Sequence, residues 1–342
     1  MRNLWPVAFC VMALAHPAAG AVPPFVALPG VGEVTVRLTD AASAGVVRYQ
    51  IREWPAGERL ADGEAHPQTD ASGLPSFRVG GLHPRPWSLQ DPRLYELVLT
   101  RADGAPLGKT RFGFRTFEVK ERRFLLNGRP LFLRGLPINP PGRDLPEATG
   151  NDPAFIRAYL RLLKGAGVNL VRTQTHEWLD ACDEVGMLVF LGRYGASPGG
   201  KPDAPPSFER ARPAYRELFL DLANHPSVVI YVLTNEVSYS STGYRQFLAR
   251  VREDIRLLDP TRPVIGNAGF GRGEPGEIYD LHPYWGWYSG NPCDWYRLEQ
   301  ELRKADAAGK PLTLSECVGA YTTDSGEFMT QSKQMATHLR WL

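Results

Sequence analysis

The sequence has few cysteines, no excess of charge of either sign and, beyond its first residues, no long apolar run. The four cysteines are Cys10, Cys182, Cys293 and Cys317, and their spacings match no metal-ligand pattern. Lys and Arg number 39 and Asp and Glu 37, so a net charge of +2 without a basic stripe gives no electrostatic basis for binding nucleic acid. No segment after the N-terminus is apolar enough to cross a membrane.

The first residues have the pattern of a secretory signal peptide, which we assign to residues 1–21. Arg2 supplies the positive charge, Leu4–Ala15 is a short apolar stretch, and small residues at 18–21 suit cleavage. The apolar stretch is shorter than the roughly 20 residues that span a bilayer, and an uncleaved anchor is the alternative. We therefore expect a secreted or periplasmic protein.

The segment 22–117 lacks helical periodicity and contains short alternating runs separated by Gly, Pro, Asp and Asn. The runs are Glu33–Leu38, Gly45–Arg52, Tyr95–Thr100 and Thr110–Thr116. This pattern is typical of a small antiparallel β-sandwich. With 342 residues the chain is long enough for a second buried core.

From Phe124 onward, strand-like apolar runs alternate with amphipathic helical runs. The strand candidates are Leu131–Arg134, Asn169–Thr173, Leu188–Gly192, Val228–Leu233, Pro263–Asn267, Ile278–His282 and Leu312–Ser315. The helical stretches lie near 153–166, 177–185, 209–224, 243–258, 295–309 and 326–341. Pro153 suits a first helical position and Gly186 a helix end. Repeated strand–helix units imply parallel strands, nearly a (β/α)₈ TIM-type barrel over residues 118–342.

The eighth strand of such a barrel is missing from the sequence. Only one helical run follows the seventh strand, and an open barrel would leave two unpaired strand edges. We expect the chain to be a piece of a longer protein, with a C-terminally incomplete barrel. A tolerated open barrel and a doubly wound sheet are the alternatives.

Two glutamates directly follow strongly apolar strands, at the end of a barrel where catalytic groups lie. Glu236 comes after Val228–Leu233, and Glu316 comes after Leu312–Leu314. A carboxylate in such a place is costly unless it is paired or functional, and the fourth and seventh strands lie across the barrel from each other. Two carboxylates about 5–5.5 Å apart suit retaining glycoside hydrolysis. A salt bridge or a helix N-terminal role would explain either glutamate alone.

Five further residues lie at strand ends, where they would bind substrate. Asn235 precedes the first glutamate and can hydrogen-bond a sugar hydroxyl, and Arg172 ends the second strand and can pair with a carboxylate. His282, Tyr284 and Trp285 close the sixth strand. Tyr284 can hydrogen-bond the nucleophile and Trp285 can stack on a sugar ring. A surface ion pair for Arg172 and aromatic packing for the other three are the structural alternatives.

A series of short segments, in this order and spacing, carries a family resemblance. The segments are Trp87–Tyr95, Arg111–Arg115, Leu126–Pro130, Leu133–Gly135, Leu163–Lys164, Asn169–Arg172, Cys182–Gly186, His225–Val228, Asn235–Glu236 and Tyr284–Tyr288. Together they resemble glycoside hydrolase family 2, which includes β-galactosidases, β-glucuronidases and β-mannosidases. The resemblance covers nearly everything from about Gly32 to Tyr321.

The resemblance implies an immunoglobulin-like sandwich followed by a catalytic TIM barrel. It implies Glu236 as acid/base and Glu316 as nucleophile, and Asn235 as the residue that binds the sugar 2-hydroxyl. Arg172 and Tyr284 would support the nucleophile. The mechanism requires no cofactor and no metal, and carbohydrate is the expected partner.

The sequence differs from the family pattern in four places. No sugar-binding jelly roll precedes the sandwich, and the eighth strand with its Trp is absent. The histidine that usually follows the family's arginine is shifted by one, to His176, and Phe190–Arg193 lacks the acidic residue often found after the third strand. We expect an exo-acting retaining glycosidase for terminal β-galactosides, β-glucuronides or β-mannosides. A non-catalytic carbohydrate-binding relic and an endo-acting mannanase-like or cellulase-like hydrolase are the alternatives.

Overall fold

The structure is a computed structural model of the whole chain. It describes residues 22–39, 45–55, 57–137, 146–173, 175–191, 207–237, 242–269, 275–283 and 297–316. The signal-peptide segment, the helix expected near 326–341 and the two predicted site residues Tyr284 and Trp285 lie outside the described residues.

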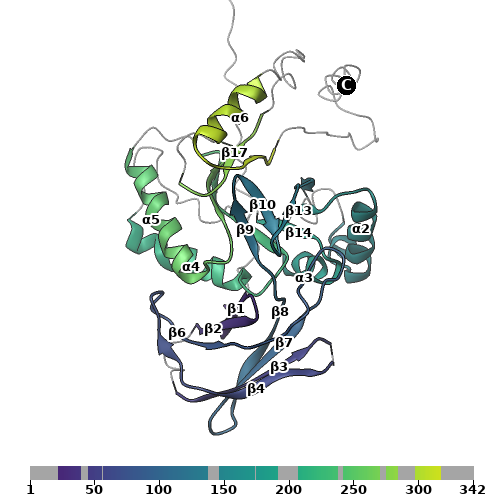
Figure 1. Cartoon of the computed structure of the whole chain (residues 1–342), viewed down its shortest axis with the longest axis vertical. Coiled ribbons are helices and arrows are strands. Elements are labelled where there is room, and N and C mark those ends of the chain that lie inside the picture. Colours follow the sequence, from purple (N-terminus) through teal and green to yellow (C-terminus); the bar gives the residue numbers. More distant parts are fainter. Residues whose placement is uncertain are drawn as a thin grey trace, which may run out of the picture.

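The N-terminal part folds into two four-stranded antiparallel sheets, seen in the lower part of Figure 1. One sheet has the order β1-β2-β6-β5 and the other β4-β3-β7-β8. Their strands are β1 (Phe25–Gly30), β2 (Glu33–Leu38), β3 (Val47–Glu53), β4 (Arg59–Ala65), β5 (Gln68–Thr69), β6 (Pro75–Val79), β7 (Tyr95–Arg101) and β8 (Pro106–Phe112). Along β2, Val34, Val36 and Leu38 are buried and the residues between them are half-buried, because successive side chains point to opposite faces of a sheet. The inward side chains of both sheets form one core.

The strands predicted around β2, β3 and β7 are confirmed. The run Thr110–Thr116 was placed too late, because β8 already begins at Pro106 and ends at Phe112. Strand β4 was missed because none of its residues is buried, so that it carries no apolar alternation to detect.

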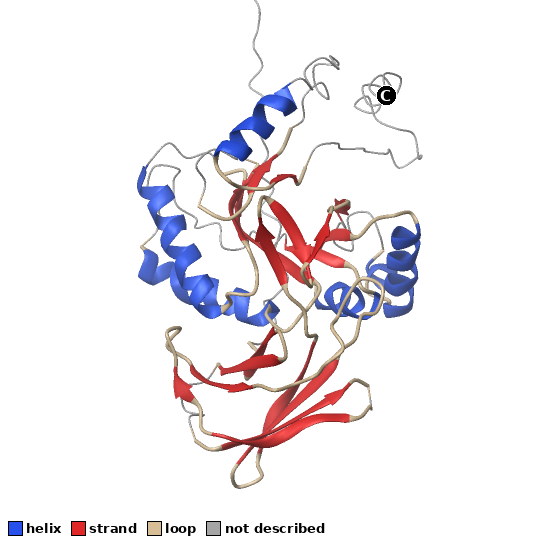
Figure 2. Ribbon diagram, viewed as in Figure 1, coloured by secondary structure: helices blue, strands red, loops and turns tan. Residues whose placement is uncertain are grey.

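Parallel strands follow, and they lie in the centre of Figures 1 and 2. Strands β12 (Gly135–Pro137), β13 (Leu170–Thr173), β14 (Leu188–Leu191), β15 (Val228–Asn235) and β16 (Val264–Ala268) form one sheet in that order. Strands β17 (Tyr279–Leu281) and β18 (Leu312–Leu314) form a second parallel pair. A bridge between Ile265 and Gly276 connects β16 with the segment that leads into β17. Within each sheet the strands run in the same direction, so their carboxyl ends lie at one edge, where β15 ends in the first sheet and β18 ends in the second.

Helices α2 and α3 lie on one side of the parallel strands and α4 and α5 on the other (Figure 2). The helices are α1 (Glu147–Gly150), α2 (Pro153–Gly165), α3 (His176–Val185), α4 (Phe208–Leu222), α5 (Thr242–Leu258) and α6 (Arg297–Ala307). The predictions for α2 to α6 are confirmed with small differences at the ends. Asp152 caps α2 by accepting hydrogen bonds from the amides of Ala154 and Phe155, and Pro153 is its first residue. Gly186 ends α3 with a φ of 74°.

The first predicted barrel strand, Leu131–Arg134, was wrong. Leu126 pairs with Arg129 across a two-residue turn, so β10 (Arg123–Leu126) and β11 (Arg129–Leu131) form a hairpin that also pairs with β9 (Phe117–Lys120). Asn127 and Gly128 both have positive φ, 52° and 74°, as a two-residue hairpin turn of the Asn-Gly type requires. The first parallel strand begins only afterwards, at Gly135.

Buried polar contacts join the antiparallel sheets to the helical part. Trp87 has no exposed surface, and its indole Nε1 donates to the carbonyl of Asp183 at 2.8 Å. Asn224 accepts from the amide of Ala27 at 2.8 Å and donates to the carbonyl of Phe25 at 3.2 Å. These bonds satisfy backbone groups of β1, an edge strand, and hold that edge against the segment that follows Leu222.

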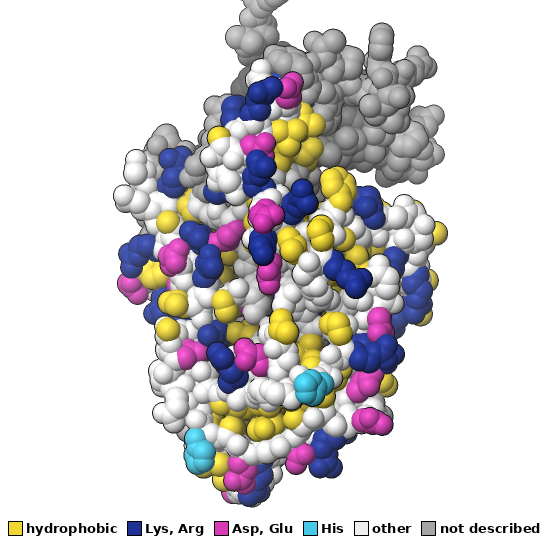
Figure 3. All heavy atoms as spheres, in the orientation of Figure 1, with side chains coloured by type: hydrophobic (Ala, Val, Ile, Leu, Met, Phe, Trp, Pro, Cys, Tyr) yellow, Lys and Arg dark blue, Asp and Glu magenta, His cyan; other side chains and the backbone are white. Residues whose placement is uncertain are grey.

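Charges on the described surface are mixed. Lys and Arg side chains are interspersed with Asp and Glu on the face drawn in Figure 3, in keeping with the small net charge. None of the helices in the described ranges combines the length and the apolar character needed to cross a lipid bilayer.

Candidate active site

The backbone turns sharply where β15 ends. Strand β15 is buried from Val228 to Thr234 and ends at Asn235. Glu236, the first residue after the strand, has a φ of 50°. This left-handed conformation costs a residue other than glycine about 1–2 kcal/mol. The amide of Glu236 donates to the carbonyl of Ala268 at 3.0 Å, and Asn267 bonds both the amide and the carbonyl of Val237. Strand β16 thus holds a strained turn that directs a carboxylate outward, a feature that concentrates at functional sites.

The two predicted carboxylates are neighbours in space. One oxygen each of Glu236 and Glu316 and one ring nitrogen of His282 all lie within 4.8 Å of one another. Glu236 comes from the end of β15 and Glu316 from just past β18, two strands that belong to different sheets. The side chains are 46% and 25% exposed, so both remain accessible to a ligand.

Arg172 makes a charged contact with one of these carboxylates. Its side chain is the third of four in β13, and its Nη1 donates a hydrogen bond to Oε1 of Glu316. Charge-assisted bonds of this kind favour the ionised carboxylate. The Arg172 side chain is 19% exposed, so its ion pair with Glu316 is half-buried and is not a surface ion pair.

His282 bridges Glu236 to a buried aspartate. Its Nδ1 lies 2.6 Å from Oε1 of Glu236, and its Nε2 lies 2.9 Å from Oγ of Ser315. The Ser315 hydroxyl donates to Oδ2 of Asp280 at 2.7 Å. The Ser315 hydroxyl has one proton, and it donates that proton to the hydrogen bond with Asp280. The hydroxyl oxygen therefore accepts a hydrogen bond from the ring, which places a proton on Nε2 of His282. Nδ1 and Glu236 therefore share one proton between them.

Asp280 is the buried end of this chain of hydrogen bonds. It has no exposed side-chain surface and accepts bonds from the Thr313 hydroxyl, the Ser315 hydroxyl and the amide of Gly269. Burial raises the pKa of Asp280 above its usual 3.8, although these hydrogen bonds and His282 act in the opposite direction. Sequence reasoning missed Asp280, Thr313 and Ser315. The sequence did contain a signal for them. Residues two apart in a strand point to the same face, which puts Asp280 with His282 on one strand and Thr313 with Ser315 on its neighbour.

Asn235 presents an unsatisfied acceptor beside Glu236. Its Oδ1 is buried and has no hydrogen-bond partner in the described part of the chain. A buried carbonyl oxygen left without a donor costs about 1–3 kcal/mol. A ligand hydroxyl that donates to this oxygen would remove that cost.

Two sets of donors in the described ranges have the spacing of metal ligands. One is Glu236, His282 and Glu316, and the other is Asp180, Asp183 and His225. In the first set a carboxylate already pairs with Arg172, and a cation would have to compete with that guanidinium. His176, to which the family pattern had drawn attention, lies against Asp221 and His225.

The sequence matches proteins of known family. The sequence model for the glycosyl hydrolases family 2 TIM barrel domain matches residues 117–340. The β-galactosidase of Vibrio cholerae serotype O1 is 29% identical over 255 residues, which cover 69% of this chain and 23% of that protein. The β-galactosidase of Aeromonas hydrophila is 32% identical over 200 residues, which cover 54% of this chain and 19% of that protein.

The fold also matches solved structures. A β-D-glucuronidase of Dictyoglomus thermophilum aligns with a TM-score of 0.67 and 22% identity, over 94% of this chain and 60% of that one. A β-glucuronidase of Ruminococcus gnavus, solved with uronic isofagomine, aligns with a TM-score of 0.64 and 20% identity, over 92% of this chain and 58% of that one. At these identities the likeness concerns the fold.

The present chain spans about a quarter or less of the two β-galactosidases and about three fifths of the two β-glucuronidases. The match to the family's barrel domain extends over more than half of the 342 residues, and the chain therefore belongs to glycoside hydrolase family 2.

Proposed function

We propose that the protein is a retaining β-glycosidase that works by double displacement through Glu316 and Glu236. The observation that carries the proposal is the approach of the two carboxylates to within 4.8 Å across the ends of β15 and β18. Retaining enzymes hold their two carboxyl groups about 5–5.5 Å apart, whereas inverting enzymes leave about 6.5–9.5 Å for a water molecule.

In the first step, an oxygen of Glu316 attacks the anomeric carbon while the bond from that carbon to the leaving oxygen breaks. Glu236 gives its proton to the leaving oxygen, so the aglycone departs as a neutral alcohol and the sugar is held as an ester. In the second step, Glu236 takes a proton from water, the water oxygen attacks the anomeric carbon, and the ester bond breaks to restore the Glu316 carboxylate. Arg172 stabilises the charged Glu316 before attack and after release.

His282 acts in this proposal as a positioning residue for Glu236. The proton that it shares with Glu236 is the one that the first step transfers, and the bond to Ser315 holds the ring in the required tautomer. The side chain of His282 is 3% exposed, which favours a role behind the acid over a contact with sugar.

Substrate contacts are proposed for the remaining predicted residues. The unsatisfied Oδ1 of Asn235 supports a bond from the sugar 2-hydroxyl, which strengthens as charge develops at the anomeric carbon. Tyr284 and Trp285, outside the described residues, would contact the nucleophile and stack on the sugar. Terminal β-galactosides and β-glucuronides are the first substrates to test, because the matched relatives carry those names. The mechanism needs no cofactor.

The same proposal extends to architecture and location. Residues 22–117 would be an immunoglobulin-like sandwich and residues 118–342 a TIM-type (β/α) barrel domain. The segment 1–21 would act as a signal peptide and direct the protein to the periplasm or the exterior.

The test is hydrolysis of a panel of aryl β-glycosides by the full chain and by Glu316→Gln and Glu236→Gln. Glu316→Gln should lose turnover by at least about 10³-fold on all substrates. Glu236→Gln should lose about 10²–10⁴-fold on poor leaving groups and much less on nitrophenolates, which need no protonation to depart. Retained activity in Glu316→Gln overturns the assignment of the nucleophile. A wild-type chain that binds sugars but releases no aglycone identifies a carbohydrate-binding relic instead, and oligosaccharide products from a polysaccharide identify endo cleavage.

A further inference from the structure

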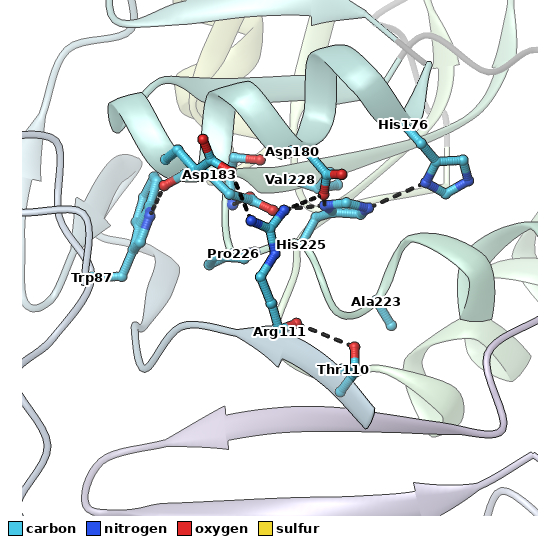
Figure 4. Close-up of polar contacts among 12 residues, drawn as sticks. Trp87, Thr110, Arg111, His176, Asp180, Asp183, Ala223, His225, Pro226 and Val228 are labelled. Atoms are coloured by element: carbon cyan, nitrogen blue, oxygen red, sulfur yellow. Dashed lines mark hydrogen bonds and ion pairs between the residues drawn. The ribbon is translucent and has the colours of Figure 1, made fainter. Parts of the chain in front are cut away.

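Two histidines face each other away from the catalytic carboxylates. His176 is the first residue of α3, and His225 lies in the turn between α4 and β15. Nδ1 of His176 is 3.4 Å from Nε2 of His225, as the dashed line between the two rings in Figure 4 shows. The rings are inclined at 40° and their centroids are 5.6 Å apart, so they meet edge to edge through nitrogen atoms rather than by stacking.

A carboxylate lies behind each ring. Nδ1 of His225 is 2.7 Å from Oδ2 of Asp183, and Nε2 of His176 is 3.1 Å from Oδ2 of Asp221. The other oxygen of Asp183 accepts from the amide of Ser227 at 3.0 Å, which orients that carboxylate. Asp183 and Asp221 are 2% and 5% exposed. When both rings are neutral and donate their N–H to these carboxylates, the two nitrogens that face each other carry lone pairs.

Two facing lone pairs repel each other, and either a proton or a metal ion between them removes that repulsion. A hydrogen bond formed by an additional proton would prefer a separation of about 2.9–3.0 Å, and 3.4 Å is long for one. Two nitrogen ligands at about 2.0–2.1 Å from a tetrahedral zinc ion are about 3.3–3.4 Å apart, which matches the observed span. A carboxylate bonded to the far nitrogen of each ring is also the usual environment of histidines that bind zinc.

We propose that His176 and His225 form a two-histidine site for a divalent transition-metal ion such as Zn²⁺. Asp183 and Asp221, each bonded to the far nitrogen of one ring, place two negative charges near the ion. The His176 side chain is 37% exposed, so water can supply the remaining ligands. The ion joins the first turn of α3 to the turn that precedes β15, and its role is to stabilise this junction.

The neighbouring set Asp180, Asp183 and His225 is a poorer site, although its atoms are close together. Arg111 donates to Asp180 at 2.6 Å, and the nitrogen of His225 on that side already faces Asp183. Figure 4 shows the guanidinium of Arg111 directed at this group from β8. A cation placed there would meet a fixed positive charge, whereas the two facing nitrogens lie on the opposite side of the His225 ring.

The test is calorimetric titration of chelator-treated full chain with ZnCl₂, with His176→Gln as the main variant. His176→Gln removes the more exposed ligand at a helix terminus, where folding is least affected, and circular dichroism checks the fold. We expect wild type to bind one more Zn²⁺ than His176→Gln, and Asp221→Asn to bind that ion about 10–100-fold more weakly. The control is His83→Gln, which removes an exposed histidine elsewhere and should leave the affinity unchanged.

Three results would overturn the proposal. The first is that wild type binds no Zn²⁺, which leaves a histidine pair that only shares a proton. The second is that His176→Gln binds Zn²⁺ with the stoichiometry and affinity of wild type. The third is that a crystal soaked in Zn²⁺ shows its anomalous peak at Glu236 and Glu316 and none between the two rings. An anomalous peak between the rings would support it directly.

Discussion

The guanidinium of Arg172, near the carboxyl end of β13, donates a hydrogen bond to the carboxylate of Glu316, which lies 144 residues further along the chain. Between these two positions the chain forms β14 to β18 and four helices in the described ranges. The contact puts a fixed positive charge beside the proposed nucleophile.

Replacement of Arg172 tests that contact. Arg172→Lys retains the charge but has one ammonium group in place of a planar fork, and Arg172→Gln removes the charge. We expect Arg172→Gln to lower kcat/KM on aryl β-glycosides by about 10²-fold, a loss of about 2.7 kcal/mol of transition-state stabilisation, and Arg172→Lys to lie between this variant and wild type. Steady-state kinetics checks the order, and equal activity of all three proteins would show that the ion pair is only structural.

His282 offers a test that separates positioning from sugar binding. His282→Asn removes the group that shares a proton with Glu236, and misplacement of a catalytic group by about 1 Å can cost about 10²-fold. We expect kcat to fall by about that factor on substrates with poor leaving groups, with little change in KM and an altered pH–rate profile. A contact with the sugar in the ground state predicts the opposite, an increase in KM at constant kcat.

Asp259 and Arg262 form a buried ion pair below β15 and β16, with side chains 2% and 1% exposed. Burial alone would raise the pKa of Asp259, but the charge of Arg262 and hydrogen bonds from Thr261 and Tyr231 together hold it below the usual 3.8. A carboxylate with a lowered pKa stabilises the fold above its unfolded pKa, and this stability is lost as pH falls through the folded pKa. Asp259→Asn should therefore cost about 3–5 kcal/mol at pH 7, because Arg262 remains buried and unpaired.

Urea unfolding at several pH values measures this effect. The difference in unfolding free energy between wild type and Asp259→Asn should be largest at neutral pH. It should shrink below about pH 4, near the ordinary pKa of an aspartate side chain. Asp62→Asn is the matched control, because Asp62 pairs with Arg59 on the surface, where both side chains are more than half exposed. That substitution should change stability by less than about 1 kcal/mol. A loss at Asp259 no larger than the loss at Asp62 would contradict the prediction.

Cys182 should be inert while the protein is folded. Its side chain has no exposed surface, and burial raises the pKa of the thiol well above its usual value. Because the thiolate is the reactive form, iodoacetamide should leave Cys182 unmodified in buffer and alkylate it in denaturant. Mass mapping of the peptide that contains Cys182 gives the result, and rapid alkylation under native conditions would mean that α3 opens readily.

Much of the fold could be predicted because local patterns carry it. Helical periodicity located α2 to α6, since a buried stripe repeats every 3.6 residues whatever the helix packs against. Short apolar runs bounded by turn residues located β13 to β18. The edge strand β4 has no buried residue, and the Asn127–Gly128 turn redirects the chain before β12. Strand β4 and this turn were missed because strand pairing and turn geometry determine where they form, and neither leaves an apolar pattern in the sequence.

The sequence by itself determined which residue types end the strands: a glutamate after β15, another after β18, and an arginine within β13. Only the tertiary structure decided which of these side chains meet and which atoms they use. The 2.6 Å contact of His282 with Glu236 and the 3.4 Å approach of His176 to His225 join residues on different elements. The packing at the end of β15 leaves the Oδ1 of Asn235 buried and without a partner among the described residues. The physical reason is that periodicity assigns a side chain to a face of its own helix or strand, whereas distances between faces depend on how the separate elements pack.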